Sequence, residues 1–423
     1  MTTNERLFNR NFFLLWQGQL VSQLGTQAFT IATMFWVKHA TGSATMMGTI
    51  MMAAMIPLVL LSPIGGTIAD RVSRKRIIVT CDVVNGVASL SLGVLMLVVP
   101  DATGLILAWL IAVAVTGGIA QSFFMPAISA AIPNLVSPDK VASANSLSEG
   151  SVQVATLVGQ GLGGLLFRIL GAPVLFIVDG ITFLFSATSE SFIKIPQELP
   201  EKAETWREAV AKFKVELREG LVYVGRHRGM RSLMLTSAIM NFFAMPFFIL
   251  LPFYVEDTLG AGPEWFGFLL AAFGGGGIVG YVIAGSVPVG EKARAAMMIA
   301  ALFLLSVSLV GVGVARSPGA AMALLAGAGV FQGIYNIHVM TILQKTTPDA
   351  YRGRVFGLLH TLVMGLSPIS LGLTGIVADL LDQNAPLMFM ICGGVLVATT
   401  LVAAMSRDYR NYLASKIEAE PAS

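Results

Sequence analysis

The sequence predicts an all-α membrane protein with twelve transmembrane helices in two six-helix bundles, and three observations support this fold class. First, 55% of the 423 residues are hydrophobic and 12% are charged, whereas soluble proteins carry about 45–50% apolar and about 25% charged residues. Second, the chain contains twelve apolar runs of roughly 20 residues, the length that crosses a bilayer. Third, the basic residues lie between these runs or at their ends. This composition excludes a water-soluble enzyme and a disordered chain.

The twelve apolar runs define the predicted spans. They are 12–37, 46–69, 77–99, 104–131, 142–167, 172–195, 232–255, 265–287, 295–315, 319–343, 353–378 and 386–405. Several contain proline or glycine, which membrane helices tolerate because neighbouring helices satisfy the freed backbone groups.

The basic residues predict the orientation of the spans. If both ends of the chain are cytoplasmic, the inner loops hold 24 of the 27 lysines and arginines, and the outer loops hold Lys38, Arg168 and Arg316. An excess of positive charge marks the cytoplasmic side. We therefore expect a multi-pass protein of the cell (inner) membrane with both termini in the cytoplasm.

A polar, charge-rich stretch halfway along the chain predicts the domain organisation. The expected parts are an N-terminal bundle at 1–195, a cytoplasmic linker at 196–231, a C-terminal bundle at 232–405 and a cytoplasmic tail at 406–423. The tripeptide Ser137-Pro138-Asp139 before the fifth span matches Thr347-Pro348-Asp349 before the eleventh, 210 residues later. An offset of half the chain is typical of two parallel repeats.

The linker contains a helical pattern of apolar residues among basic ones. The apolar residues are Trp206, Val210, Phe213, Leu217 and Leu221. This pattern predicts an amphipathic helix on the inner membrane face. A solvated linker helix is the alternative.

The loop between the second and third spans reads Gly66-Thr67-Ile68-Ala69-Asp70-Arg71-Val72-Ser73-Arg74-Lys75. It resembles the loop signature of the major facilitator superfamily, with Ser73 where that family often has glycine. The resemblance implies the major facilitator fold, and it implies a conformational latch between the two halves formed by Gly66, Asp70, Arg71, Arg74 and Lys75. In this interpretation Asp70 lies near the N-terminus of the eleventh helix, where the helix dipole favours a negative charge. The alternative is a basic loop that serves orientation only.

The fifth span carries a glycine pattern at Gly150, Gly159, Gly163 and Gly164. It resembles the glycine-rich fifth-helix motif of antiporters in the same superfamily, with Gln160 in place of the usual proline. Small residues at this spacing allow close helix packing, and we expect the partner to be the eighth span, which contains Gly274 to Gly277. Generic small-residue packing is the alternative.

Three short strings resemble the macrolide-efflux and enterobactin-exporter branch of drug:proton antiporters. They are Asn9-Arg10-Asn11-Phe12, Leu251-Pro252-Phe253-Tyr254 and Arg352-Gly353-Arg354-Val355-Phe356-Gly357. The resemblance implies a transporter that exports a drug, a macrolide or a siderophore.

Three acids lie within predicted spans away from the interface, where ionisable groups are costly and mark transport pathways. Asp179, Glu149 and Asp82 are therefore the candidates for proton coupling. Asp179 is the first choice because no base is near it in sequence. The alternatives are that Asp82 extends the loop network, that Glu149 pairs with cytoplasmic bases, and that Asp179 is hydrogen-bonded to a neighbouring helix.

Polar and aromatic residues predict the substrate cavity. Neutral polar residues, including Gln19, Gln23, Thr26 and Gln27, recur every three or four residues along the first span. Such a stripe avoids lipid, so we expect it to face a water-filled cavity; joining helices is the alternative. The seventh span contributes Asn241, Phe243 and Phe247.

These features predict a secondary active transporter that exports a bulky amphiphilic small molecule by proton-coupled alternating access. The alternative is facilitated uptake, or transport of a lipid-like substrate, by the same fold. An enzyme is not expected, because no catalytic cluster, phosphate loop or metal motif is present in the sequence. We expect no cofactor, no metal and no nucleic acid. The expected partners are the substrate, protons and membrane lipids, and the chain is expected to be a monomer.

Overall fold

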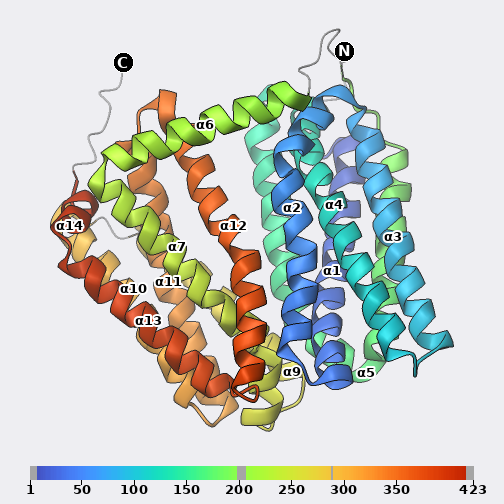
Figure 1. Cartoon of the computed structure of the whole chain (residues 1–423). Helices are drawn as coiled ribbons and strands as arrows, with labels where there is room; N and C mark the ends of the chain where they lie inside the picture. Colours follow the sequence, from blue (N-terminus) through green and yellow to red (C-terminus); the bar gives the residue numbers. More distant parts are fainter. Residues whose placement is uncertain (1–6, 198–205, 287–288, 416–423) are drawn as a thin grey trace. The chain divides into compact units, whose positions relative to one another are not determined.

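The computed structural model describes residues 7–197, 206–286 and 289–415, and the regular structure in these ranges is helical (Figure 1). The chain divides into two compact units, Met1–Phe213 and Lys214–Ser423. The division falls inside α6 (Trp206–Arg226), within the predicted linker.

The helices of each unit follow one another with short connections. Unit 1 contains α1 (Arg10–Thr41), α2 (Ala44–Arg71), α3 (Arg74–Val98), α4 (Thr103–Leu135), the 3-10 turn η1 (Pro138–Lys140) and α5 (Val141–Ser191). After α6, unit 2 contains α7 (Arg228–Ile249), α8 (Leu251–Phe253), the π-helical turn η2 (Tyr254–Thr258), α9 (Glu264–Ser286), α10 (Glu291–Val314), α11 (Pro318–Thr346), α12 (Asp349–Leu380), α13 (Ala385–Met405) and α14 (Arg407–Leu413).

The predicted spans coincide with these helices to within a few residues. In the described ranges, ten helices are long and apolar enough to cross a membrane by length and composition. Two predicted spans, 142–167 and 172–195, fall together in one of them, α5. The first predicted span is α1, which is not among the ten and carries the polar stripe. These assignments account for all twelve predicted spans.

Gly171 separates the two spans of α5. Its backbone has φ 74° and ψ 168°, a conformation that only glycine adopts readily because any other residue would bring its Cβ into contact with the backbone. Pro173 follows, and its ring prevents a regular hydrogen bond at this point of the helix. The break therefore follows directly from the local sequence.

The helices pair in the same order in both units. In unit 1 the first span packs on the fifth, the second on the fourth and the third on the sixth. In unit 2 the corresponding pairs are α7 with α12, α9 with α11, and α10 with α13. Such a correspondence is what two parallel repeats would produce.

Glycines at the helix contacts make this pairing close. Gly276 and Gly280 of α9 face the backbone carbonyls of Ala326 and Val330 in α11, and Gly329 of α11 faces that of Phe273. A Cβ at any of these glycines would overlap with a backbone atom, so the two helices approach until their backbones touch. Membrane helices associate largely through such packing.

The last helix, α14, is docked onto unit 2. Tyr409 is buried and its hydroxyl lies 3.3 Å from that of Tyr335. The Tyr412 hydroxyl lies 2.7 Å from the Thr346 Oγ1, and burial raises the pKa of Tyr412 to about 12. The Arg294 guanidinium donates to the carbonyl oxygens of Leu413 and Ser415, which closes the C-terminal end of the helix. Residues 416–423 of the predicted tail lie outside the described ranges.

The end of α6 contacts the start of α12. Glu219 forms a 3.0 Å ion pair with Arg354, and the rings of Tyr223 and Tyr351 stack with their centroids 4.6 Å apart. Gly220 lies against the Arg354 backbone. The side chains of Trp206, Val210 and Phe213, on which the predicted amphipathic face depends, lie outside the described part of the structure, and that prediction stays open.

Gly329→Ala is expected to lower the free energy of unfolding by about 1–3 kcal/mol, because the added Cβ would overlap with the Phe273 carbonyl. The matched control is Gly275→Ala, whose Cβ would meet open space. The effects of both substitutions are measured by thermal denaturation of the purified protein in detergent, with the loss of monodisperse material as the readout. Equal effects of the two substitutions would contradict the close backbone contact of α9 and α11.

Candidate functional site

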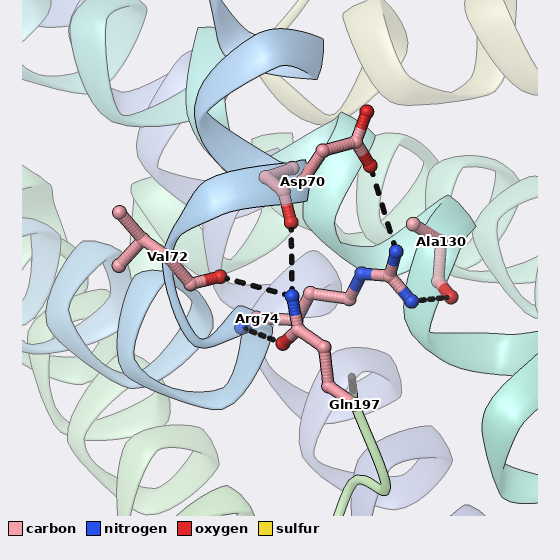
Figure 2. Close-up of polar contacts among 6 residues, drawn as sticks. Asp70, Val72, Arg74, Ala130 and Gln197 are labelled. Carbon is pink, nitrogen blue, oxygen red and sulfur yellow. Dashed lines mark hydrogen bonds and ion pairs between the residues drawn. The ribbon is translucent and has the colours of Figure 1, made fainter. Parts of the chain in front are cut away.

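The loop between α2 and α3 carries the predicted conformational latch, and Arg74 lies at its centre (Figure 2). The Arg74 Nη2 is 3.5 Å from the Asp70 Oδ1, and the Nη1 donates a 2.9 Å hydrogen bond to the carbonyl of Ala130 in α4. The Asp70 side chain is 69% exposed, and exposed ion pairs contribute only about 0–1 kcal/mol. The bond to Ala130 is therefore the stronger of the two contacts.

Gln197 holds the same turn from the segment after α5 (Figure 2). Its Oε1 accepts a 2.9 Å hydrogen bond from the Arg74 backbone N–H, and its Nε2 donates to the carbonyls of Ala69 and Val72. Helix ends leave such backbone groups unpaired, and one amide side chain satisfies three of them. Sequence analysis missed Gln197, because its distance from the loop along the chain gives no signal of this contact.

The turn explains why serine is accepted at position 73. Ser73 has φ −53° and ψ 115°, outside the left-handed region that requires glycine, and its Oγ accepts from the Arg76 N–H at the start of α3.

Of the other latch residues, Gly66 faces open space and Lys75 is half-buried, while Nε and Nη2 of Arg71 are buried without a hydrogen-bond partner in the described structure. Their role as a latch stays a prediction.

Asp179 is buried between three helices of unit 1. Ser89 of α3 donates a 2.6 Å hydrogen bond to the Asp179 Oδ2, while the Oδ1 is buried without a hydrogen-bond partner. Gly25 of α1 lies directly against Asp179 and Thr182, so that no side chain fits there. The structure therefore places this candidate within a protein contact, away from the residues that line the two cavities described below.

Asp82 is also buried, and it faces an acid that sequence analysis missed. The Asp82 and Glu190 carboxyls lie within hydrogen-bonding reach of each other, beside the hydroxyl of Ser186, and each residue is at most 1% exposed. Glu190 was overlooked because it lies at the end of a predicted span. A signal was available, since Glu190 follows Asp179 by 11 residues, about three helical turns, and so shares its face of α5.

Glu149 has a different environment, since it is exposed on the wall of a cavity of about 350 Å³ in unit 1. Gln19 and Gln23 of the polar stripe line the same cavity, together with Trp16. The Trp16 indole donates a hydrogen bond to the Ser151 Oγ. This part of the stripe therefore faces a cavity.

The other predicted residues of the stripe serve helix contacts. Gln27 donates to the Thr156 Oγ1 and accepts from the Gln160 Nε2, both at 3.4 Å, and thus joins α1 to α5. The Thr26 hydroxyl donates to the Ser22 carbonyl of its own helix. Neither Thr26 nor Gln27 is among the residues that line a described cavity.

A larger cavity of about 1150 Å³ lies within unit 2. Of the residues predicted from the seventh span, Asn241 and Phe247 line this cavity, whereas Phe243 is not among its lining residues. Asn241 accepts a 3.2 Å hydrogen bond from Ser367, and Phe247 stacks on Phe389. The rest of the wall is mainly aliphatic and aromatic, with polar groups from Ser237, Gln332, Tyr335, Asn336 and His360.

The glycines of the predicted antiporter-like motif pack against α1. Gly159 lies on the Gln27 side chain and Gly163 on that of Ile31. Gly164 is buried, and Gly150 faces open space. Within the units, the described contacts of Gly159 and Gly163 are with α1, and those of Gly276 and Gly280 of α9, the eighth span, are with α11. The expected contact between the fifth and eighth spans stays a prediction. The contacts thus correspond to small-residue packing inside each unit.

The described residues contain no group of three or more histidines, cysteines, aspartates and glutamates arranged to hold a metal ion. The site is thus built from buried carboxyls, neutral amides and apolar cavity walls, which are suited to binding and moving small molecules.

A model of the Major Facilitator Superfamily matches residues 15–372. The chain belongs to the major facilitator superfamily. It is therefore a multi-pass membrane transporter of small molecules and not an enzyme.

Relatives of this transporter include named efflux proteins. Macrolide efflux protein A from Streptococcus pyogenes is 22% identical over 401 residues, covering 94% of this chain and 96% of that protein. The multidrug efflux pump Tap from Mycolicibacterium fortuitum is 27% identical over 370 residues, covering 84% and 86% of the two chains. The resemblance to macrolide-efflux proteins is confirmed.

Solved structures of other transporters share the fold. A bacterial homologue of the human lysosomal transporter Spinster superposes with a TM-score of 0.69 at 15% identity, over 95% of this chain and 96% of that chain. A POT family transporter superposes with a TM-score of 0.68 at 14% identity, over 94% and 96% of the two chains. The predicted fold class, twelve helices in two bundles, is confirmed.

Arg74→Lys is expected to lower the free energy of unfolding by about 1.5–3 kcal/mol, because an ammonium cannot contact Asp70 and the Ala130 carbonyl from the guanidinium's positions. Arg76→Lys is the matched control, since Arg76 lies two residues later and is exposed. Thermal denaturation of the purified variants measures the difference. Indistinguishable midpoints would show that the Ala130 contact does not hold the loop.

Proposed function

We propose that this transporter exports a bulky amphiphilic small molecule, such as a drug, a macrolide or a siderophore, in exchange for protons. The observation that carries the proposal is the large, mainly apolar cavity of unit 2. The relatives named for macrolide and multidrug efflux support the same substrate class.

The chemistry of the cavity wall favours an amphiphile. Small-molecule sites have volumes of about 300–1,000 Å³ and combine apolar walls with a few placed polar groups. The cavity of unit 2 reaches about 1150 Å³, and no lysine, arginine, aspartate or glutamate is among its described lining residues. A sugar would require many hydrogen-bond partners, and an ion would require charged ligands. A large, mostly apolar molecule with a few polar groups suits this wall better.

The proposed cycle uses the family's alternating access in the membrane. Asp179 or Glu149 takes a proton from outside, with Asp82 as the third candidate. The latch at Asp70 and Arg74 then rearranges, and the substrate exchanges near the middle of the membrane. In this proposal the chain acts as a monomer among membrane lipids, with both termini in the cytoplasm. The buried position of Asp179 and the cavity position of Glu149 support the first step.

Gly357→Leu is expected to weaken binding of a large macrolide such as erythromycin by about tenfold, because filling part of a binding cavity costs about 1–3 kcal/mol. Gly357 lines the cavity and its Cβ would meet open space, so the leucine side chain can enter the cavity. Gly353→Leu is the matched control, since Gly353 also has open space but is not among the cavity-lining residues. Equilibrium binding to the purified variants measures the effect. Equal affinities would place the substrate elsewhere.

Proteoliposomes with a pH gradient are expected to show proton flux when erythromycin is added. Asp179→Asn is expected to abolish this flux, because asparagine cannot carry the proton. Ser89→Ala is the control, because it removes the hydrogen bond to Asp179 but keeps the carboxyl. Binding of erythromycin without any flux in the unsubstituted protein would overturn proton exchange and favour facilitated or lipid-like transport.

A further inference from the structure

Three polar side chains of unit 1 form a buried group without complete hydrogen bonding. They are Asp82 of α3 and Ser186 and Glu190 of α5, each at most 1% exposed. The Asp82 Oδ2 and the Glu190 Oε2 are buried without a hydrogen-bond donor, although the two carboxyls lie within hydrogen-bonding reach of each other and of the Ser186 hydroxyl. Buried polar atoms are almost always paired, and two carboxyl oxygens can pair with each other only if one of the two groups carries a proton.

The surroundings of the two carboxyls favour one shared proton. The two carboxyls face each other across the contact of α3 with α5. The other titratable groups near the pair are the Cys81 thiol and the Asp179 carboxyl, and no base is among the interactions of either acid. Two adjacent carboxylates without a positive partner repel each other strongly in a buried site. One proton between them removes this repulsion and gives both unpaired oxygens a hydrogen bond.

Gln19 connects this pair to a cavity. The Gln19 Nε2 donates a 2.7 Å hydrogen bond to the Glu190 Oε1, and Gln19 also lines the smaller cavity of unit 1. The residue before it, Gly18, packs directly on Ser186, which brings α1 close to the pair. The amide donates to the Glu190 carboxyl and so stabilises its ionised form. A molecule or water in the cavity that donates to the Gln19 Oε1 would strengthen this hydrogen bond and favour release of the proton.

We propose that Asp82 and Glu190 hold one exchangeable proton between them, and that Gln19 controls its release to the cavity. On release, the O–H bond at the Glu190 Oε2 breaks, the proton passes to water in the cavity, and both carboxyls are left ionised. The pair is then the release end of a path that begins at Asp179, whose Ser89 partner lies two turns beyond Asp82 on α3. This inference rests on the proposed proton exchange and names its second site.

Infrared spectroscopy of the full-length protein in lipid tests the shared proton without any transported compound. The expected result is a carbonyl band of a protonated carboxylic acid that both Asp82→Asn and Glu190→Gln remove. Glu149→Gln, which changes an exposed carboxyl, and Asp179→Asn are expected to retain the band. Retention of the band in Glu190→Gln would overturn the proposal. A band that appears only when sodium is omitted would assign the pair to a metal cation and would also overturn it.

Proton release on addition of erythromycin, followed with a pH-sensitive dye in weakly buffered solution, tests the control by Gln19. Gln19→Leu is expected to retain the infrared band but to lose the release at erythromycin concentrations that saturate the variant. Glu190→Gln is expected to lose both band and release. Wild-type release in Gln19→Leu or Glu190→Gln would overturn this inference and leave proton-coupled export standing. Absence of release from the unsubstituted protein would instead overturn the proposed proton exchange itself, and this inference with it.

Discussion

Polar groups inside a membrane helix must find partners within the protein, because hydrocarbon offers none. Most polar side chains that the structure describes in the spans follow this constraint. Gln27 pairs with Thr156 and Gln160, Asn241 accepts from Ser367, and many serines and threonines donate to a carbonyl of their own helix. Against this background the group of Asp82, Ser186 and Glu190 is exceptional, since two adjacent carboxyls are buried together and an oxygen of each has no hydrogen-bond donor. The exception is what identifies the group as a candidate binding site for protons.

The close packing of the helices follows from the same environment. Without a hydrophobic effect between helices in lipid, association depends on contact area, and glycines allow backbones to touch. Gly276 and Gly329 do this between α9 and α11, and Gly86 and Gly180 do it between α3 and α5. The second contact also brings the acids of α3 and α5 together. Packing and polar chemistry are thus determined by the same small residues.

The two units differ in the groups that they bury. The acids among the buried residues, Asp82, Asp179 and Glu190, all lie in unit 1, whereas unit 2 contains the large apolar cavity. In the proposed function, unit 1 handles the proton and unit 2 supplies much of the substrate surface. Their pairing order is nevertheless the same, so the difference arises from side chains on a repeated framework and not from a different arrangement of helices.

The sequence by itself determined the number, length and order of the spans, because crossing a bilayer requires a run of apolar residues that can be read locally. It also identified the family signature at Asp70 and Arg74, and it identified Asp82 and Asp179 as acids within spans. Contacts between helices were decided only by the tertiary structure. Gly159 and Gly163 pack on α1, Gln27 joins two helices, and Phe243 is not among the residues of the described cavity wall. Glu190 and Gln197 gained importance only through residues more than 100 positions away. The physical reason is that the periodicity of a sequence shows which residues share one face of a helix. It does not show which neighbouring helix that face contacts.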